Sequence, residues 1–379
     1  MIQERILKNA RIVLEGDTIN GSLLIRGGRI AAIDTGPHAG AGEDMEGDLL
    51  LPGLVELHTD HIEKHMKPRP GVLWNPMTAV LAHDAQLCAA GITTVLDAVR
   101  IGNAEHREDD DVMALATAEQ ILACRTNNVL RSDHLIHLRC EISAPNVTDL
   151  FERLADHPLI RLVSLMDHTP GQRQFTRIDK WRQYYGGKTG KSDKELDELI
   201  VRMHANAEAN SYKNRRAVAT ASRERGHTLA SHDDATEAHI DEAIELGMTI
   251  AEFPTTHEAA AAANAEGMRI VAGAPNLVRG GSHSGNIPTA ELAEVGHLDA
   301  LSSDYVPVSL LHSAFLLREQ FHGDLPAAIQ KVSATPARMV GLTDRGAIAE
   351  GLRADLIQVN DRFDAPVIRQ IWREGARVA

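Results

Sequence analysis

The sequence predicts an α/β protein: a (β/α)8 TIM-like barrel with a small flanking β-sandwich built from the N- and C-terminal segments. Three observations indicate this fold. Strand-like apolar runs alternate with helix-like stretches through the middle of the chain, short alternating strands recur at both ends, and polar residues follow the middle strands. Alternation of strands and helices is typical of a parallel sheet, and a barrel of eight such units needs about 250 residues. We expect the sandwich at 1–49 plus 346–379 and the barrel at 50–345.

The two ends of the chain are expected to form short strands separated by turns. Near the start, residues 6–14 are a candidate strand, and 22–33 are a candidate hairpin that turns at Gly27-Gly28. Residues 354–359 and 367–372 show the same alternation. We expect the two groups to pair in one small β domain, with the long middle inserted between them.

The middle of the chain contains eight candidate strands. Helix-like stretches such as 105–127, 235–246 and 257–266 lie between these short apolar runs. The carboxyl ends of the strands meet on one rim of a barrel, and the active site lies on that rim, so residues at these ends are functional candidates. The strands are expected to end near His58, Asp97, Glu141, Asp167, His232, Phe253, Ala274 and Asp304.

The first of these strands carries the most informative segment of the chain. An apolar run from residue 49 leads into His58, Thr59, Asp60 and His61. Side chains alternate along a strand, so His58 and Asp60 point to one side and Thr59 to the other. Two ligand-type side chains on one face, at the carboxyl end of a buried strand, make half of a metal site. The alternative is a strand that simply ends in polar loop residues.

The polar residues at the strand ends together predict a metal centre. Each alone is compatible with a helix cap or a hydrogen-bonded core residue, but their convergence on one rim favours metal binding. Mixed histidine and carboxylate ligands suit one or two divalent ions; we expect Zn²⁺, with Mn²⁺ or Fe²⁺ as alternatives. The predicted ligands are His58, Asp60, Glu141, His168, His232 and Asp304, with His61, Asp167 and Glu252 as additional candidates.

Asp304 has a second predicted role. Two metals would bridge a hydroxide and lower its pKa for nucleophilic attack, and Asp304, in Ser-Ser-Asp-Tyr, would accept that water's proton as the catalytic base. Asp233 and Asp234 follow His232 directly and precede a helix expected near residue 235, so we interpret them as supporting residues that partly serve as helix caps.

One connection, from His168 to His227, is much longer than the roughly two to six residues usual in such loops. Within 171–191 it holds six basic residues and one acid, together with four of the chain's few aromatic residues. A solvated helix with a Gly-rich turn would explain this composition. The functional interpretation is a lid or wall that holds a polyanion, with Arg173 and Lys188 as substrate-binding candidates.

A Gly-rich loop is expected after the seventh strand. Its glycines allow backbone N–H groups to approach an anion, and phosphate sites recur after strands seven and eight of this barrel class. A flexible Gly- and Ser-rich loop is the alternative. The side-chain donors that make it a substrate-binding candidate are Arg279, Ser282, His283 and Ser284.

Composition excludes several kinds of partner. A formal net charge of −14 argues against nucleic acid or an anionic membrane, whereas an anionic small molecule remains compatible when a metal reverses the local field. No apolar run approaches the roughly 20 residues of a membrane span, and the N-terminal residues do not resemble a secretory signal. Three cysteines without zinc-motif spacing suggest reduced thiols. We therefore expect a cytoplasmic protein whose partner is a small molecule, and we further expect a homo-oligomer.

Several motifs resemble the amidohydrolase superfamily, and within it the phosphonate-metabolism diphosphatases of the PhnM type. The superfamily frame is seen in Leu-Pro-Gly-Leu-Val-Glu-Leu-His at 51–58, in Asp304 and in Gly-Leu-Arg-Ala-Asp-Leu-Ile at 351–357. The closer likeness extends from the first strand to the C-terminus. It rests on Glu-Leu-His-Thr-Asp at 56–60, the segments 91–98 and 138–141, Leu-Met-Asp-His-Thr-Pro-Gly-Gln-Arg-Gln-Phe at 165–175, Ala-Ser-His-Asp-Asp-Ala-Thr at 230–236, and the segments 251–256, 273–276 and 279–286.

This resemblance implies hydrolysis of α-D-ribose 1-methylphosphonate 5-triphosphate in the carbon–phosphorus lyase pathway, with release of diphosphate. It also implies a metal-dependent barrel beside a β-sandwich. The chain departs from the usual superfamily pattern, which has His-x-His on the first strand and a carboxylated Lys later. Asp60 replaces the second histidine, Glu141 is the candidate to replace the Lys, His61 stands where the branch is expected to have Asn, and Glu252 replaces a histidine on strand six.

Two rival functions follow from the same residues. An amide or cyclic-amide hydrolase, similar to dihydroorotase, would use the same metal centre, and fold alone does not separate it from a diphosphatase. The basic insertion and the Gly-rich loop favour phosphate. A non-catalytic barrel that serves as a binding or assembly subunit would lack ligands at the rim, and here candidate ligands are present.

Overall fold

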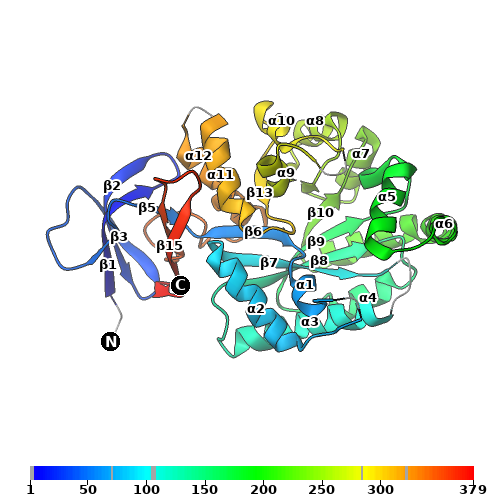
Figure 1. Cartoon of the computed structure of the whole chain (residues 1–379), viewed down its shortest axis with the longest axis horizontal. Coiled ribbons are helices and arrows are strands. Elements are labelled where there is room, and N and C mark those ends of the chain that lie inside the picture. Colours follow the sequence, from blue (N-terminus) through cyan, green and yellow to red (C-terminus); the bar gives the residue numbers. More distant parts are fainter. Residues whose placement is uncertain (1–3, 70, 104–107, 283–284, 321–322) are drawn as a thin grey trace.

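The structure is a computed structural model of the whole chain, and it describes all residues except 1–3, 70, 104–107, 283–284 and 321–322 (Figure 1). The side chains of 108–109 and 188 are likewise outside the described part. The strands form two eight-stranded sheets, one from the terminal segments and one from the middle of the chain. In Figure 1 the terminal sheet lies at one end of the molecule and the second sheet, surrounded by helices, forms the larger body. The predicted α/β fold is confirmed.

The terminal sheet pairs strands from both ends of the chain, as the sequence predicts. Its strand order is β16-β15-β14-β5-β1-β2-β3, and β5 pairs antiparallel with β14 while β4 pairs with β1. Its strands are β1 (Glu4–Val13), β2 (Thr18–Arg26), β3 (Arg29–Thr35), β4 (Glu43–Asp44), β5 (Leu49–Pro52), β14 (Leu356–Asn360), β15 (Val367–Arg373) and β16 (Ala376–Arg377).

This sheet has its own core and its own turn chemistry. Leu7, Leu23 and Trp372 are fully buried in a cluster separate from that of the barrel. The hairpin between β2 and β3 turns at Gly27 and Gly28, which both have positive φ, a conformation that glycine adopts without strain. The proposed division of the chain at residue 49 falls at the start of β5, all of which pairs within this sheet.

The second sheet is the predicted barrel, with eight parallel strands in the order of the sequence. The predicted strand ends agree with the structure except at the second strand, which continues past Asp97 to Ile101 and leaves Asp97 inside the strand. The strands are β6 (Leu54–Thr59), β7 (Ile92–Ile101), β8 (Asp133–Glu141), β9 (Ile160–Met166), β10 (Thr228–His232), β11 (Ile250–Glu252), β12 (Arg269–Gly273) and β13 (Ala300–Ser302).

Side chains help to close the barrel between its first and last strands. The buried carboxylate of Glu56, on β6, accepts hydrogen bonds from the Ser303 backbone N–H at 2.6 Å and from the Ser302 hydroxyl at 2.8 Å. The Ser302 hydroxyl also lies 2.6 Å from the carbonyl oxygen of His58. This network fixes the ends of β6 and β13, the two strands that lead to His58 and Asp304.

Helices surround the barrel strands (Figure 1). Those near positions 235 and 257 begin after Thr236 and Thr256, whose hydroxyls accept a hydrogen bond from the third following backbone N–H. No described helix combines the length and hydrophobicity needed to cross a membrane. The helices are α1 (Ile62–Met66), α2 (Pro76–Ala89), α3 (Glu108–Thr126), α4 (Val147–Leu154), α7 (Glu237–Glu245), α8 (His257–Ala265), α9 (Ala274–Arg279), α10 (Thr289–Glu294), α11 (Ser309–Gln320), α12 (Leu325–Gln330) and α13 (Ala334–Met339).

The long connection after β9 folds as a helical insertion. It contains the short helix η1 (Arg173–Phe175), then α5 (Ile178–Thr189) and α6 (Asp193–Glu224). Ser192 and Glu195 form a capping box at the start of α6. Because the insertion has a small core of its own, it holds its shape against the barrel rim. That core consists of Phe175, Trp181, Leu196, Leu199 and Met203.

Candidate metal centre and substrate cavity

A cavity of about 580 Å³ opens where the barrel strands end. Its floor is formed by strand-end residues, and its walls come from α1, the insertion and the loop after β12. Its charged side chains are four acids and four bases: Asp60, Glu63, Asp233 and Asp304 against Lys64, Arg100, Arg139 and Arg279. His58, His168 and His232 also line it. The structure thus brings most of the predicted rim residues to one cavity.

Glu252 orients two of these histidines. Its carboxylate oxygens lie 2.7 Å from Nδ1 of His58 and 2.8 Å from Nδ1 of His232, so each ring donates its Nδ1–H to Glu252. Neighbouring His137 and hydrogen-bonded His232 lower the pKa of Glu252, although burial raises it. Burial itself, followed by Arg139 for His58, keeps the pKa values of both rings well below the ordinary value. Both rings are therefore neutral, and each keeps Nε2 as a metal ligand atom.

Glu141 orients His168 in the same way as Glu252 orients His58 and His232. Its carboxylate lies 2.6 Å from Nδ1 of His168, accepts from the His168 backbone N–H, and accepts from the Ser143 hydroxyl. Glu141 is outside the residues that line the cavity, whereas His168 is among them. The sequence analysis predicted Glu141 as a metal ligand in place of the superfamily Lys; its geometry here is that of a residue that positions His168.

Asp233 meets His168 and His232 in the cavity. One ligand atom from each of these three residues lies within 4.8 Å of the others. Oδ2 of Asp233 is buried without a hydrogen-bond partner in the described part of the chain, although Nε2 of His232 lies 3.3 Å from it. Burial raises the pKa of Asp233 to about 7, against the opposing charge of His168. A buried carboxylate in this state is stabilised by a cation, so this group suits a divalent metal.

Three residues at the strand ends have backbone conformations that non-glycine residues rarely adopt. Asp233, Phe253 and Asp304, which follow β10, β11 and β13, have φ values of 54°, 56° and 50°. Such conformations cost free energy and are concentrated at functional sites. Phe253 packs edge-on against the rings of His58 and His232, with centroids 5.0 and 5.5 Å away. The backbone is thus bent to aim these side chains at the cavity.

Asp304 and Asp60 lie on the cavity wall near Arg139. Burial, and then the charge of Asp60, raise the pKa of Asp304 to about 8, while Arg139 lowers it. Nη1 of Arg139 is 3.8 Å from Oδ2 of Asp60. The hydroxyl of Thr59 donates to the backbone carbonyl of Asp304, which ties the ends of the first and last strands together.

Three of the predicted site residues are turned away from the cavity. Asp167 is buried and accepts hydrogen bonds from Thr169 and from the Ser211 hydroxyl of α6. Arg173 is also buried and forms an ion pair with Asp234, which attaches the insertion to the loop after β10. His61 contacts two other histidines beside α1. Asp167 and Arg173 therefore anchor the insertion in the structure.

The predicted phosphate-binding residues are only partly described. Arg279 and Ser282 line the cavity. His283, Ser284 and the side chain of Lys188 lie outside the described residues. Gln174, Tyr184 and Tyr185 of the insertion line the cavity, so the insertion forms one of its walls.

Sequence comparison places the chain among known enzymes. The amidohydrolase family matches residues 190–379. The α-D-ribose 1-methylphosphonate 5-triphosphate diphosphatase of Escherichia coli (strain K12) is 44% identical over 376 residues, which cover 98% of this chain and 100% of that protein. The chain belongs to the amidohydrolase family. The predicted membership is confirmed, and with it the expectation of a hydrolase related to this diphosphatase.

More distant proteins resemble the chain in sequence or in fold. An adenine deaminase of Desulfatibacillum aliphaticivorans is 24% identical over 98% of this chain and 58% of its own length. The structure of a dihydropyrimidinase from Brevibacillus agri superposes with a TM-score of 0.65, at 12% identity, over 99% of this chain and 95% of that one. A 5-methylcytosine deaminase from Klebsiella pneumoniae gives a TM-score of 0.66, at 16% identity, over 99% and 97%. These structures support the barrel with its terminal sheet.

Members of the amidohydrolase family usually bind divalent metals, and this barrel has side chains for one. His168, His232 and Asp233 form a group of candidate ligands, whereas in the group of His58, His232 and Glu252 the carboxylate accepts hydrogen bonds from both rings and so orients them. Oδ2 of Asp233, which has no hydrogen-bond partner among the described residues, and the neutral imidazoles of His58 and His232 fit a cation at this place.

The sequence analysis missed four charged cavity residues, Glu63, Lys64, Arg100 and Arg139, and underestimated a fifth, Asp233. Arg139 precedes Glu141 by two positions on β8, so the alternation of side chains was a signal that both face the barrel interior. Lys64 lies in α1 beyond the first strand, where no periodicity marks it. Asp233 was interpreted as a helix cap, but Thr236 caps α7 and leaves Asp233 to the cavity.

Proposed function

We propose that this protein hydrolyses α-D-ribose 1-methylphosphonate 5-triphosphate to the 5-phosphate and diphosphate, as a metal-dependent step of phosphonate catabolism. The observation that carries the proposal is the 44% identity to the Escherichia coli diphosphatase over the full length of both chains. The cavity supports it, because four cationic side chains line a space large enough for a small phosphorylated sugar.

We assign the metal to the residues that meet at the barrel rim. His58, His168, His232 and Asp233 would hold one or two divalent ions, with Asp60 and Asp304 on the same wall. Zn²⁺ suits this nitrogen and carboxylate set, and Mn²⁺ or Fe²⁺ are the alternatives. Such an ion supplies an acidified water and neutralises charge on phosphoryl oxygens. Glu141 and Glu252 act through the histidines that they orient.

Asp304 is the proposed general base. Its raised pKa reflects a carboxylate that burial and Asp60 make more basic than usual. A carboxylate of this kind accepts the proton of the attacking water while the bond between the α- and β-phosphates breaks, and diphosphate leaves. Arg139 lies 3.8 Å from Asp60 and lowers the pKa of Asp304, so its charge stabilises both carboxylates.

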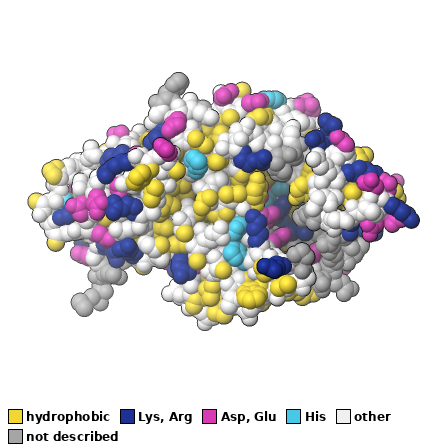
Figure 2. All heavy atoms as spheres, in the orientation of Figure 1, with side chains coloured by type: hydrophobic (Ala, Val, Ile, Leu, Met, Phe, Trp, Pro, Cys, Tyr) yellow, Lys and Arg dark blue, Asp and Glu magenta, His cyan; other side chains and the backbone are white. Residues whose placement is uncertain are grey.

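The phosphate chain of the substrate would contact the cationic side of the cavity. Arg279 and Ser282 lie in and after α9, and Lys64 and Arg100 lie on the wall near α1. The acids and bases of the cavity balance in number, so a bound divalent ion makes the cavity positive and suited to a polyanion. A positive cavity is compatible with the mixed surface seen in Figure 2, where acidic and basic side chains are intermingled at both ends of the molecule.

Two further expectations belong to this proposal. The described cysteines, Cys88, Cys124 and Cys140, are all buried free thiols, which supports a reducing, cytoplasmic environment. We also propose that the protein is a homo-oligomer, and light scattering would measure its mass in solution.

The proposed function is tested by incubating the Zn²⁺- or Mn²⁺-loaded protein with the ribose phosphonate triphosphate and following phosphorus by NMR. We expect one diphosphate for each 5-phosphate formed. Parallel incubations with adenine and dihydrouracil test the amide-hydrolase alternative. Turnover of a cyclic amide without release of diphosphate would overturn the proposal, and absence of turnover on every substrate would support the non-catalytic alternative.

A further inference from the structure

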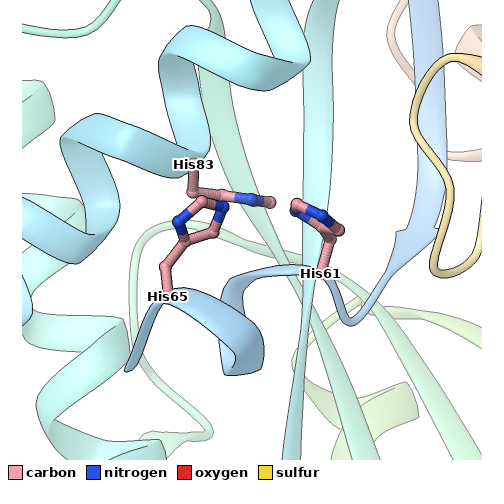
Figure 3. A group of neighbouring side chains, drawn as sticks. All are labelled: His61, His65 and His83. Carbon is pink, nitrogen blue, oxygen red and sulfur yellow. The ribbon is translucent and has the colours of Figure 1, made fainter. Parts of the chain in front are cut away.

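Three histidines face one another outside the cavity, between α1 and α2 (Figure 3). His61 precedes α1, His65 lies within it, and His83 lies on α2. Their ring centroids are 5.0 Å apart for His61 and His65, 5.7 Å for His61 and His83, and 5.8 Å for His65 and His83. The cavity lining contains none of the three.

Each ring has one buried nitrogen without a hydrogen-bond partner in the described part of the chain. These atoms are Nδ1 of His61, Nε2 of His65 and Nδ1 of His83. His83 is fully buried and His61 is 6% exposed. Unpaired polar atoms in such a place cost free energy, and three together are rare in a core. They therefore point to a ligand that the three nitrogens share.

The second nitrogen of two rings is already fixed by a neighbour. Nε2 of His83 lies 2.8 Å from the Asp97 carboxylate on β7, and His65 forms a side-chain hydrogen bond with Gln86. When His83 donates Nε2–H to Asp97, its Nδ1 keeps a lone pair directed at the other two rings. A carboxylate behind a histidine in this way is the usual arrangement around a metal-binding imidazole.

The three rings lie close enough together to share one ion. One nitrogen from each ring lies within 4.8 Å of the others. Around a tetrahedral Zn²⁺ with bonds of about 2.1 Å, ligand nitrogens are roughly 3.4 Å apart, so small side-chain rotations would complete the site.

We propose that His61, His65 and His83 form a second transition-metal site that binds Zn²⁺ or a similar ion through three imidazole nitrogens. A set of three imidazole nitrogens favours Zn²⁺, Co²⁺, Ni²⁺ or Cu²⁺ over Mg²⁺ and Ca²⁺, which prefer oxygen ligands. The ion joins α1 to α2. Since Glu63 and Lys64 of α1 line the cavity, the ion also holds that wall in place.

The test counts metal ions per chain. Metal-free full-length protein is dialysed against Co²⁺ or Zn²⁺, and bound metal is measured by mass spectrometry, together with the melting temperature with and without metal. His65→Asn is the main variant because this side chain is only half-buried, and His61→Asn is the second. His157→Asn is the matched control, because His157 also has a buried unpaired nitrogen but lies in the loop before β9.

We expect both cluster variants to bind one ion fewer per chain than the wild type and the His157→Asn control. We also expect them to lose part of the metal-induced rise in melting temperature. His168→Asn, at the barrel rim, should lose a different ion, so His65→Asn combined with His168→Asn should show both losses. If folded His65→Asn keeps the wild-type metal content, the proposal is wrong and the three rings are a packing cluster.

Discussion

Nδ1 of His168 lies 2.6 Å from the carboxylate of Glu141, and this hydrogen bond joins the ends of the neighbouring strands β8 and β9. The contact sets which nitrogen of His168 faces the cavity. The Glu141 carboxylate also accepts hydrogen bonds from the Ser143 hydroxyl and from the His168 backbone N–H. These two bonds fix the position of Glu141 itself. The orientation of His168 in the cavity therefore depends on residues that do not line the cavity.

Replacing Glu141 by Gln should weaken metal binding at the barrel rim. The amide is a poorer acceptor for Nδ1–H, so His168 loses its fixed tautomer, and metal affinity should fall about 10- to 100-fold. Competition with a fluorescent chelator measures this change. Glu258→Gln, on α8, is the control. Unchanged affinity in Glu141→Gln would show that His168 does not bind the metal.

Replacing Asp304 by Asn should reduce kcat by about 100- to 10,000-fold if this carboxylate is the base. Asn tolerates the positive φ of residue 304, so melting temperature should stay close to that of the wild type. Steady-state kinetics with the triphosphate, beside a thermal melt, measures both quantities. A variant that retains near-normal kcat would remove Asp304 from the mechanism.

Replacing Arg279 by Gln should raise KM for the triphosphate more than it lowers kcat. The loss of one charge-assisted contact is worth about 1.5–3 kcal/mol, or roughly 10- to 100-fold in affinity. Arg269→Gln is a suitable control, because Arg269 is exposed, pairs with Asp299 and lies outside the cavity lining. Equal KM values for the two variants would place the phosphates elsewhere.

Because of His134, the free energy of unfolding should fall as the pH becomes alkaline. Although burial lowers its pKa, the adjacent carboxylates of Asp97 and Asp84 raise it to about 10. A pKa raised above the unfolded value of about 6.5 gives stability that is present below that pH and is lost as the pH rises towards 10. His134→Gln should cost about 3–5 kcal/mol near neutral pH, because two buried carboxylates lose their partner.

Urea denaturation of the wild type and of His134→Gln at about pH 7 and about pH 10 measures this effect. The difference in unfolding free energy between the two proteins should shrink at the higher pH. A difference that is the same at both values would mean that His134 is neutral in the folded protein.

The sequence predicted the fold because eight apolar strands and their polar ends are local patterns. His58, His232 and Asp304 were predicted at the cavity for the same reason: each stands at or just past the carboxyl end of a buried strand. The roles of Arg173 and Asp167 depend on how the insertion packs, which no local pattern encodes. Arg173 is therefore found in an ion pair with Asp234 and Asp167 in a hydrogen bond to α6.

His61 is a second residue whose surroundings could not be predicted from the local sequence. Its position after the first strand suggested the barrel metal centre, but β6 ends at Thr59 and the chain turns into α1. The ring therefore faces α2. Its neighbours His65 and His83 are separated from it by a turn and a helix, and only the packing of α1 on α2 brings the three together.

The pairing of β5 with β14 has a consequence for how the chain reaches its final shape. Gln358 on β14 donates to Asp48, a residue 310 positions earlier. Contacts of such separation form slowly, because the intervening chain must become compact before they are made. The barrel should thus assemble first and the terminal sheet last, so the fluorescence of Trp372, buried in that sheet, would report the final stage of refolding.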